Sequence, residues 1–134
     1  MATTSQLPTA MFNEGFLAEI YRQRPATSGI TVVTRFPPEP NGFLHLGHSK
    51  AIAVNFGFAK VHGGYCYLRF DDTNPDEEEE RYFVAIRQII DWLGFSPVKV
   101  TYSSDYFDRL YDLAEHLIVI GGAYVCHCSG MLCI

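Results

Sequence analysis

The feature that most constrains the fold is an abrupt change of pattern between residues 30 and 64. Residues 30–36 are β-branched and aromatic, which predicts a buried strand. Three prolines and Asn41-Gly42 follow, and they prevent the strand from continuing. From Gly47 the apolar residues recur at helical spacing until Gly63-Gly64 ends the helix. The face of this helix that is expected to be buried carries Ile52, Phe56 and Ala59.

Two histidines, His45 and His48, flank Gly47 where this helix is expected to begin. A helix N-terminus presents free backbone N–H groups and the positive end of the helix dipole, an arrangement that favours phosphate. Imidazoles on the first turn can donate hydrogen bonds to phosphate oxygens, and Gly47 leaves room for a flat purine or a phosphate. The alternative is that both histidines are ordinary polar surface residues, because a four-residue pattern recurs by chance. The wider sequence decides between the two.

The rest of the chain alternates between helical and strand-like periodicity. In chain order the expected segments are a helix over 9–24, a linker over 25–29, strands over 65–71 and 98–102, a helix over 105–120 and a strand over 124–128. A further helix is expected with Asn74 as N-cap, Pro75 at its first position and Glu77 completing a capping box. Its acidic run, 76–80, is interpreted as a solvated first turn that the helix dipole favours. The residues expected to face inward are Phe12, Phe16, Leu17, Ile20 and Tyr21 in the first helix, Phe83, Ile86, Ile90 and Leu93 before Gly94, and Leu110, Leu113, Ala114 and Leu117 in the last helix.

Strand, helix, strand, helix, strand is the order of one half of a doubly wound parallel α/β sheet. Ligands of such sheets lie beyond the carboxyl ends of the strands. Polar residues follow all three strands, in the segments 35–42, Asp71-Asp72 and Ser103-Ser104. Their convergence at one edge of the sheet is expected to form the binding site.

Composition limits the class of protein. Hydrophobic residues make up 48% of the chain and charged residues 19%, which is enough apolar material to bury a core. The formal net charge of -5 argues against strong general binding of nucleic acid. No apolar run reaches membrane-spanning length and residues 1–8 do not resemble a signal peptide, so a cytoplasmic protein without membrane contact is expected.

The four cysteines predict neither a disulfide framework nor a metal site. Cys66 falls in an expected strand, and the others are Cys126, Cys128 and Cys133. Residues 126 and 128 of an extended strand share one face while His127 points to the other, and no second cysteine pair completes a zinc tetrahedron. No protein-bound metal is expected.

Four separated motifs stand in the chain: Arg35 to Lys50, which contains His45-Leu46-Gly47-His48, then Asn55 to Lys60, Leu68 to Pro75 and Tyr102 to Phe107. Together they resemble the opening of a class I glutaminyl-tRNA synthetase of the eukaryotic type. The resemblance runs from Phe12 to Cys128 and is highly specific, because the motifs keep the order and spacing of that family. His-Leu-Gly-His is similar to the nucleotide-binding signature of the class.

The resemblance implies a Rossmann-like fold and a reaction. Residues 1–29 would form an N-terminal helix and linker, 30–105 the first half of the catalytic domain, and 106–134 the start of an inserted acceptor-arm domain with a divergent tail. ATP, accompanied by Mg2+, would activate glutamine as an aminoacyl-adenylate, and the acyl group would pass to the acceptor end of tRNA(Gln). Association with other synthetases in a complex belongs to the same expectation.

Roles for the nucleotide site follow from the resemblance. His45 and His48 would be the catalytic residues. The residues implied to bind ATP are Glu39, Pro40, Asn41, His45, Leu46, Gly47, His48, Ser49, Lys50 and Ala51.

Roles for the amino-acid site follow in the same way. Asp71 would bind the α-amino group of the substrate, and Arg35 would help to define the pocket for its side chain. The alternative for Asp71 is a strand-end carboxylate that accepts hydrogen bonds from loop amides, which is the part expected of Asp72. Arg69 is interpreted equally well as a structural ion-pair residue.

Some features of the family are absent from these 134 residues. They contain no Lys-Ser-Lys type loop to support the triphosphate, and residues 130–134 depart from the polar continuation of the family. The chain is therefore expected to be a truncated piece that is inactive alone. Truncation, a misread exon boundary and an alternative transcript are equally compatible with the sequence.

Three functional hypotheses follow. The first is a glutaminyl-tRNA synthetase, favoured because Asn41 stands where glutamyl relatives of this branch resemble Ser or Thr. The second is one of those glutamyl enzymes, because half of a site does not by itself separate glutamine from glutamate. The third is a noncatalytic module that retains contacts with a nucleotide or a tRNA end.

Overall fold

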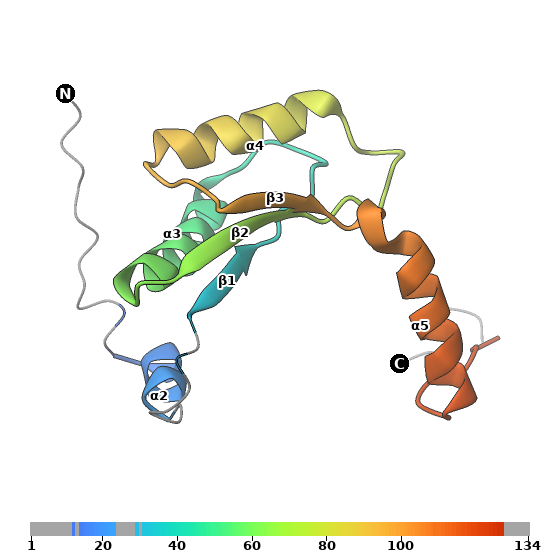
Figure 1. Ribbon diagram of the computed structural model, residues 1–134. Coiled ribbons are helices and arrows are strands. Elements are labelled where there is room, and N and C mark those ends of the chain that lie inside the picture. Colours follow the sequence, from blue (N-terminus) through green and yellow to red (C-terminus); the bar gives the residue numbers. More distant parts are fainter. Residues whose placement is uncertain (1–11, 13, 24–28, 30, 128–134) are drawn as a thin grey trace. The chain divides into compact units, whose positions relative to one another are not determined.

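The computed structural model describes residues 12, 14–23, 29 and 31–127. In chain order its elements are α2 (Phe16–Arg22), β1 (Val33–Phe36), α3 (Leu46–Val61), β2 (Tyr65–Phe70), α4 (Glu80–Trp92), β3 (Lys99–Tyr102), the 3-10 helix η1 (Ser104–Tyr106) and α5 (Phe107–Val119) (Figure 1). The chain divides into two compact units, residues 1–103 and residues 104–134.

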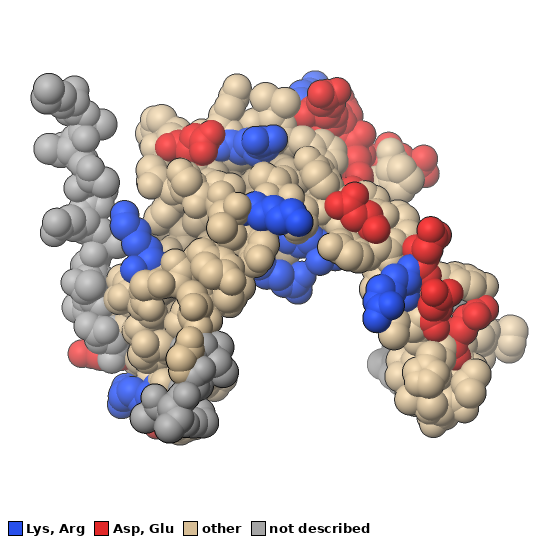
Figure 2. All heavy atoms as spheres, viewed as in Figure 1, with Lys and Arg blue, Asp and Glu red and all other residues tan. Residues whose placement is uncertain are grey.

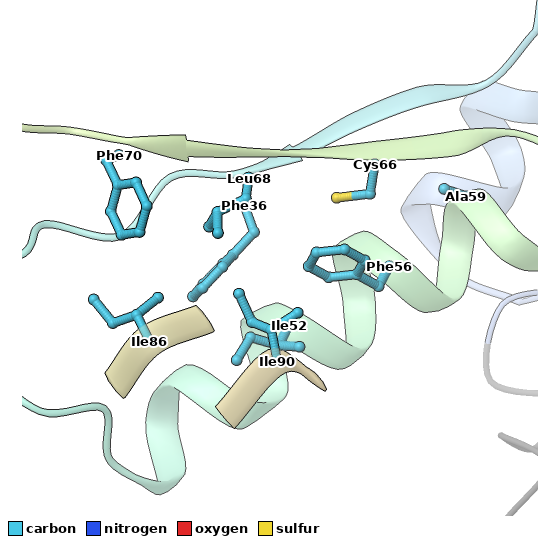
Figure 3. Close-up of a cluster of buried hydrophobic side chains, with 9 residues drawn as sticks. All are labelled: Phe36, Ile52, Phe56, Ala59, Cys66, Leu68, Phe70, Ile86 and Ile90. Atoms are coloured by element: carbon cyan, nitrogen blue, oxygen red, sulfur yellow. The ribbon is translucent and has the colours of Figure 1, made fainter. Parts of the chain in front are cut away.

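β1, β2 and β3 form one parallel sheet in the order β1-β2-β3. Val33 of β1 pairs with Tyr65 of β2, and Tyr67 of β2 pairs with Lys99 of β3. α3 connects β1 to β2 and α4 connects β2 to β3, and both helices pack on the same face of the sheet (Figures 1 and 3). Consecutive crossovers of one hand produce this arrangement. The predicted α/β fold with parallel strands is confirmed.

The hydrophobic core lies between the sheet and these two helices. Figure 3 shows strand side chains pointing toward those of α3 and α4; the cluster consists of Phe36, Ile52, Phe56, Ala59, Cys66, Leu68, Phe70, Ile86 and Ile90. Burying one large apolar side chain stabilises a fold by about 1.5–3 kcal/mol, so this cluster supplies most of the driving force. Successive strand residues point to opposite faces, so Tyr65, Tyr67 and Arg69 lie on the other face, where they are exposed or half-buried.

The start of α4 differs from the prediction. The helix begins at Glu80 rather than beside Asn74, and residues 75–77 form a separate turn. The Glu77 N–H donates to the Asn74 carbonyl oxygen at 3.2 Å, and the Asn74 N–H donates to Glu78 Oε1 at 2.9 Å. The predicted capping box with Glu77 is therefore wrong. Figure 2 shows acidic side chains gathered at the start of α4, where their repulsion within one helical turn disfavours an earlier helix.

The inward stripe of α4 is confirmed. Ile86 and Ile90 are buried, and Phe83 and Leu93 are half-buried against the core. Gly94 ends the helix in the left-handed region, with a φ of 79°. The Gly94 and Phe95 N–H groups donate to carbonyls of the last turn, which satisfies backbone acceptors that a helix end leaves open.

The N-terminal helix predicted over 9–24 is not continuous. Residues 14 and 15 are bends, and Gly15 has a φ of 86°, so α2 starts anew at Phe16. Phe16 is 78% exposed and Ile20 is exposed too, contrary to the predicted stripe. The stripe is right for Phe12 and Tyr21, which both meet the Phe58 ring of α3 edge-on. Residues 9–11, residue 24 and most of the predicted linker lie outside the described residues.

In the second unit, α5 confirms the predicted helix but not its burial. Leu110, Leu113, Ala114 and Leu117 are exposed rather than inward. A helical stripe is buried only where another element packs on it, a condition that an apolar pattern does not by itself supply. Residues 124–127 form no strand, and residue 128 of that predicted strand is outside the described part. Within the described residues, no helix is long and apolar enough to cross a membrane.

Gly64 joins α3 to β2 through a close approach of two backbones. Gly63 adopts a φ of 65°, and the Gly64 N–H donates to the Ala59 carbonyl oxygen at 2.8 Å, which closes the helix. The Tyr65 N–H then donates to the Val32 carbonyl oxygen at 3.0 Å. A Cβ atom on Gly64 would lie 2.8 Å from the Val32 carbonyl carbon, which is inside van der Waals contact.

We predict that Gly64→Ala lowers the free energy of unfolding by about 1 to 3 kcal/mol, the usual cost of forcing an atom into occupied space. Urea unfolding followed by circular dichroism measures this change. Gly42→Ala is the control, because a Cβ at Gly42 meets nothing within 4 Å. Equal free energies of unfolding for the two variants would contradict the prediction.

Candidate functional site

Hydrogen bonds tie the ends of the three strands together at the carboxyl edge of the sheet. The Asp71 N–H, directly after β2, donates to the Pro38 carbonyl oxygen in the loop after β1, at 2.9 Å. The Ser103 N–H, directly after β3, donates to the Phe70 carbonyl oxygen at the end of β2, at 3.0 Å. The structure therefore brings together the three segments in which the sequence predicts a site.

A buried serine holds the carboxylate of Asp71. The Ser103 hydroxyl donates to Asp71 Oδ1 at 2.7 Å and accepts from Nε and Nη2 of Arg69, at 3.1 and 2.9 Å. Ser103 is 2% exposed, whereas Arg69 and Asp71 are half-buried. In the structure Arg69 thus reaches Asp71 through the hydroxyl of Ser103, a role that the sequence pattern does not indicate.

His45 and His48 form a reciprocal cap at the start of α3. Nδ1 of His45 accepts from the Gly47 N–H and Nδ1 of His48 accepts from the His45 N–H, both at 3.1 Å. The two ring centroids are 4.1 Å apart. A ring nitrogen that accepts a hydrogen bond carries no proton, so each neutral imidazole has its proton on Nε2. The cap leaves two Nε2–H donors at a helix start whose first turn has no acidic residue.

Gly47 serves this cap directly. A Cβ atom at Gly47 would lie 2.9 Å from Cε1 and 3.1 Å from Nδ1 of His45. The sequence pattern predicts that this glycine leaves room for a ligand. In the structure the room beside it is taken by the His45 imidazole, so the glycine lets the ring reach its backbone donor.

The other residues expected to bind ATP differ in exposure: Glu39, Asn41, Leu46 and Lys50 are exposed, Ser49 and Ala51 are half-buried, and Pro40 is buried. Asn41 Nδ2 donates to Glu39 Oε2 at 2.9 Å, and Ser49 Oγ donates to the Leu46 carbonyl oxygen at 2.6 Å. These side chains shape the loop and the first turn of α3. Lys50 forms no ion pair among the described residues.

Arg35 is exposed in β1 and pairs in register with Tyr67 of β2. It lies on the sheet face opposite the core, the face that also carries Arg69. No hydrogen bond or ion pair joins Arg35 to Asp71 within the part of the chain that the structure describes. The two predicted amino-acid-binding residues are thus not joined by a hydrogen bond or an ion pair in the described part of the chain.

An aromatic contact connects the loop before α3 to helix α4, and the sequence pattern does not predict it. Phe43 meets the ring of Tyr82 in α4 edge-on, with centroids 5.1 Å apart. The guanidinium of Arg81 lies 4.9 Å from the Tyr82 ring centroid and forms an ion pair with Glu79 at 2.7 Å. No local sequence signal links residues so far apart in the chain.

The described residues hold no cluster of three or more His, Cys, Asp or Glu side chains suited to a metal ion. Cys128 and Cys133 lie outside them. Burial raises the pKa of the Cys66 thiol, against smaller lowering effects from hydrogen bonds with Thr34 and the Phe36 backbone. Cys66 therefore stays an uncharged thiol at neutral pH and acts as a small core residue.

Residues 31–131 match the family described as tRNA synthetases class I (E and Q), catalytic domain. The chain belongs to this synthetase family. It is 61% identical over 132 residues to a probable glutamine-tRNA ligase of Schizosaccharomyces pombe and 58% identical over 132 residues to the glutamine-tRNA ligase of Saccharomyces cerevisiae. Each comparison covers 89% of this chain and 16% of the relative, so the chain spans about a sixth of the length of these relatives.

Solved structures of the same synthetase family agree with the fold. The structure of a glutamate tRNA ligase from Elizabethkingia meningosepticum in complex with its amino acid has a TM-score of 0.64 at 26% identity, and covers 67% of this chain and 20% of that one. The four motifs of this chain all lie inside the matched residues 31–131. Three of these motifs contain the residues at the carboxyl ends of the strands. The residues that match the family are therefore also the residues that form the candidate site.

The reciprocal cap predicts a tautomer. When neutral, both His45 and His48 should carry the proton on Nε2, because each Nδ1 accepts a backbone N–H. Long-range nitrogen-proton NMR spectra of the imidazoles report the tautomer of each ring. Gly47→Ala should release the His45 ring from its donor and mix its tautomers, while His116 of α5 serves as the unaffected reference. A neutral His45 with its proton on Nδ1 would exclude the cap.

Proposed function

We propose that this chain provides the first half of the nucleotide-binding domain of a glutamine-tRNA ligase. In the proposed reaction the α-carboxylate of glutamine attacks the α-phosphorus of ATP, which forms glutaminyl-adenylate and releases pyrophosphate. A ribose hydroxyl at the 3′ end of tRNA(Gln) then attacks the acyl carbon, an ester bond forms, and AMP leaves with the bond between the acyl carbon and the phosphate oxygen broken. Such chemistry depends on positioned donors and charges rather than on a protein nucleophile.

The observation that carries the proposal is the placement of two opposite functions at one edge of the sheet. The Nε2–H donors of His45 and His48 stand at the start of α3 and suit phosphate oxygens, whose charge grows in the transition state. Asp71 follows β2 and suits the ammonium group of an amino acid. Its Oδ2 has no hydrogen-bond partner among the described residues and is open to that group.

Glutamine is the favoured amino acid. The relatives that are 58–61% identical are glutamine-tRNA ligases, while the glutamate ligases of known structure are 26–28% identical. Asn41 supports the same choice. In this proposal Arg35 contributes to the pocket for the substrate side chain, and Lys50 adds positive charge near the phosphates.

Further parts of the proposal come from family membership and, for the location, from the sequence pattern of residues 1–8 and the lengths of the apolar runs. Mg2+ accompanies ATP as part of the substrate, the protein acts in the cytoplasm, and it associates with other synthetases. The acceptor end of tRNA(Gln) is the nucleic acid that the whole protein binds.

The test is a chimera in which residues 31–131 replace the matching segment of the Saccharomyces cerevisiae glutamine-tRNA ligase. We expect it to charge tRNA(Gln) with glutamine, measured with labelled glutamine and ATP. The 134-residue chain, assayed beside it, should form no glutaminyl-tRNA above a no-protein control. A folded chimera that charges neither amino acid would refute the proposal, and one that charges glutamate would favour the glutamyl alternative.

Asp71→Asn keeps the shape of the side chain but removes the charge that faces the ammonium group. We expect glutamine affinity to weaken by about 1.5 to 3 kcal/mol, the scale of a hydrogen bond to a charged group, while ATP affinity changes little. The KM values of the chimera for glutamine and for ATP measure the two effects. Asp76→Asn is the matched control, because Asp76 is an exposed carboxylate in the acidic run. Equal weakening for both substrates would make Asp71 a structural residue.

A further inference from the structure

We propose that Ser103 is a positioning residue of the amino-acid site. Its buried hydroxyl fixes the carboxylate of Asp71 in the orientation that receives the substrate ammonium group and connects this carboxylate to Arg69. This inference rests on the proposed function, because it assumes that Asp71 binds the amino group.

Hydrogen bonds from Arg69 and to Asp71 orient the hydroxyl of Ser103. A serine oxygen has two acceptor lone pairs and one proton to donate. Nε–H and Nη2–H of Arg69 both donate to the Ser103 oxygen, at 3.1 and 2.9 Å, and because a guanidinium accepts no hydrogen bond, the hydroxyl proton is left for Asp71 Oδ1 at 2.7 Å. The guanidinium charge polarises the hydroxyl and strengthens its bond to the carboxylate.

Backbone hydrogen bonds hold both Ser103 and Asp71 in place. The Ser103 N–H is bonded to the Phe70 carbonyl, and the Asp71 N–H is bonded to the Pro38 carbonyl. Phe70 is fully buried and stacks on Tyr102 with ring centroids 5.5 Å apart. Asp71 directly follows Phe70, and Ser103 directly follows Tyr102, so both polar residues come after strand residues that are packed against each other.

The intervening serine also affects how much of the carboxylate stays available. An arginine that pairs bidentately with a carboxylate occupies both of its oxygens. Ser103 occupies Oδ1 alone, and among the described residues Oδ2 has no hydrogen-bond partner. Asp71 is thus oriented by one oxygen and can present the other to a ligand.

A competing explanation is that Ser103 ties β2 to β3 and has no effect on the substrate. That role predicts a loss of stability without selectivity between substrates. The positioning role predicts a selective rise in the KM for glutamine and its recovery by a residue that keeps the hydroxyl.

The experiment compares Ser103→Ala, Ser103→Thr and Thr34→Ala in the chimera. Ser103→Ala should raise the KM for glutamine about tenfold, the scale of one hydrogen bond to a charged group, while the KM for ATP changes by less than about twofold. Ser103→Thr should restore most of the glutamine affinity. Thr34→Ala is the matched control, because it removes a half-buried hydroxyl bonded to the Asn55 carbonyl oxygen at 2.8 Å, on the other face of the sheet. Should Ser103→Ala fail to fold, Ser103→Cys replaces it, with a smaller rise expected from its weaker S–H donor.

Hydrogen exchange of the Arg69 Nε–H in the 134-residue chain gives a readout that does not depend on activity. Exchange should be slow in the native chain and in Ser103→Thr, and fast in Ser103→Ala. An active chimera in which Ser103→Ala leaves the KM for glutamine unchanged, or raises both KM values equally, would overturn the role of Ser103 alone. A native chimera that is folded but inactive would overturn the proposed function, and this inference with it.

Discussion

The position of β2 between two parallel neighbours is the constraint on which the rest of the structure depends. Its pairing sets Leu68 opposite Phe36 and Phe70 opposite Tyr102, which places these residues on the helix-covered face. By the same alternation Asp71, one residue beyond Phe70, belongs to the opposite face. A slip of one residue would exchange the two faces and turn a carboxylate toward the apolar core, at a cost that no local contact could offset. The burial of the core therefore also decides where the site can be.

Much of this fold was predictable because its signals are local and redundant. The β-branched run before Phe36, the helical spacing after Gly47 and the glycines at 63 and 64 agree with one another, and the structure follows them. The start of α4 was not predictable in this way, because Asn74 can cap a helix or close a turn at similar free energy. The choice depends on Glu78 and the neighbouring charges. The predicted burial of α5 was wrong for a different reason. A sequence shows that a helix has an apolar stripe but does not show whether another element packs on that stripe.

The candidate site also has features that the sequence predicts and features that it does not. Topology alone predicts that residues after parallel strands meet, and Asp71 and Ser103 do meet. That Ser103 reaches Asp71 depends on the register of β3 against β2, which the sequence does not state. The residue types at His45 and His48 suggest an anion site, but their reciprocal cap depends on side-chain rotamers. The sequence thus predicts which residues form the site. The structure adds which of their atoms already form hydrogen bonds within the chain and which atoms can still bind a ligand.

The position of the charges explains how a chain with a negative net charge can offer a site for an anionic ligand. The chain has a net charge of -5, yet the first turn of α3 contains no acidic residue. Acidic residues gather instead at the start of α4, where the positive end of that helix dipole stabilises them (Figure 2). The two helix starts therefore differ: the start of α4 lies beside carboxylates of the chain itself, whereas the start of α3 keeps the Nε2–H donors of its two imidazoles for a ligand. Because electrostatic effects on exposed groups fall off within about 10 Å at moderate salt, net charge is a weaker guide to an anion site than the residues of the first helical turn.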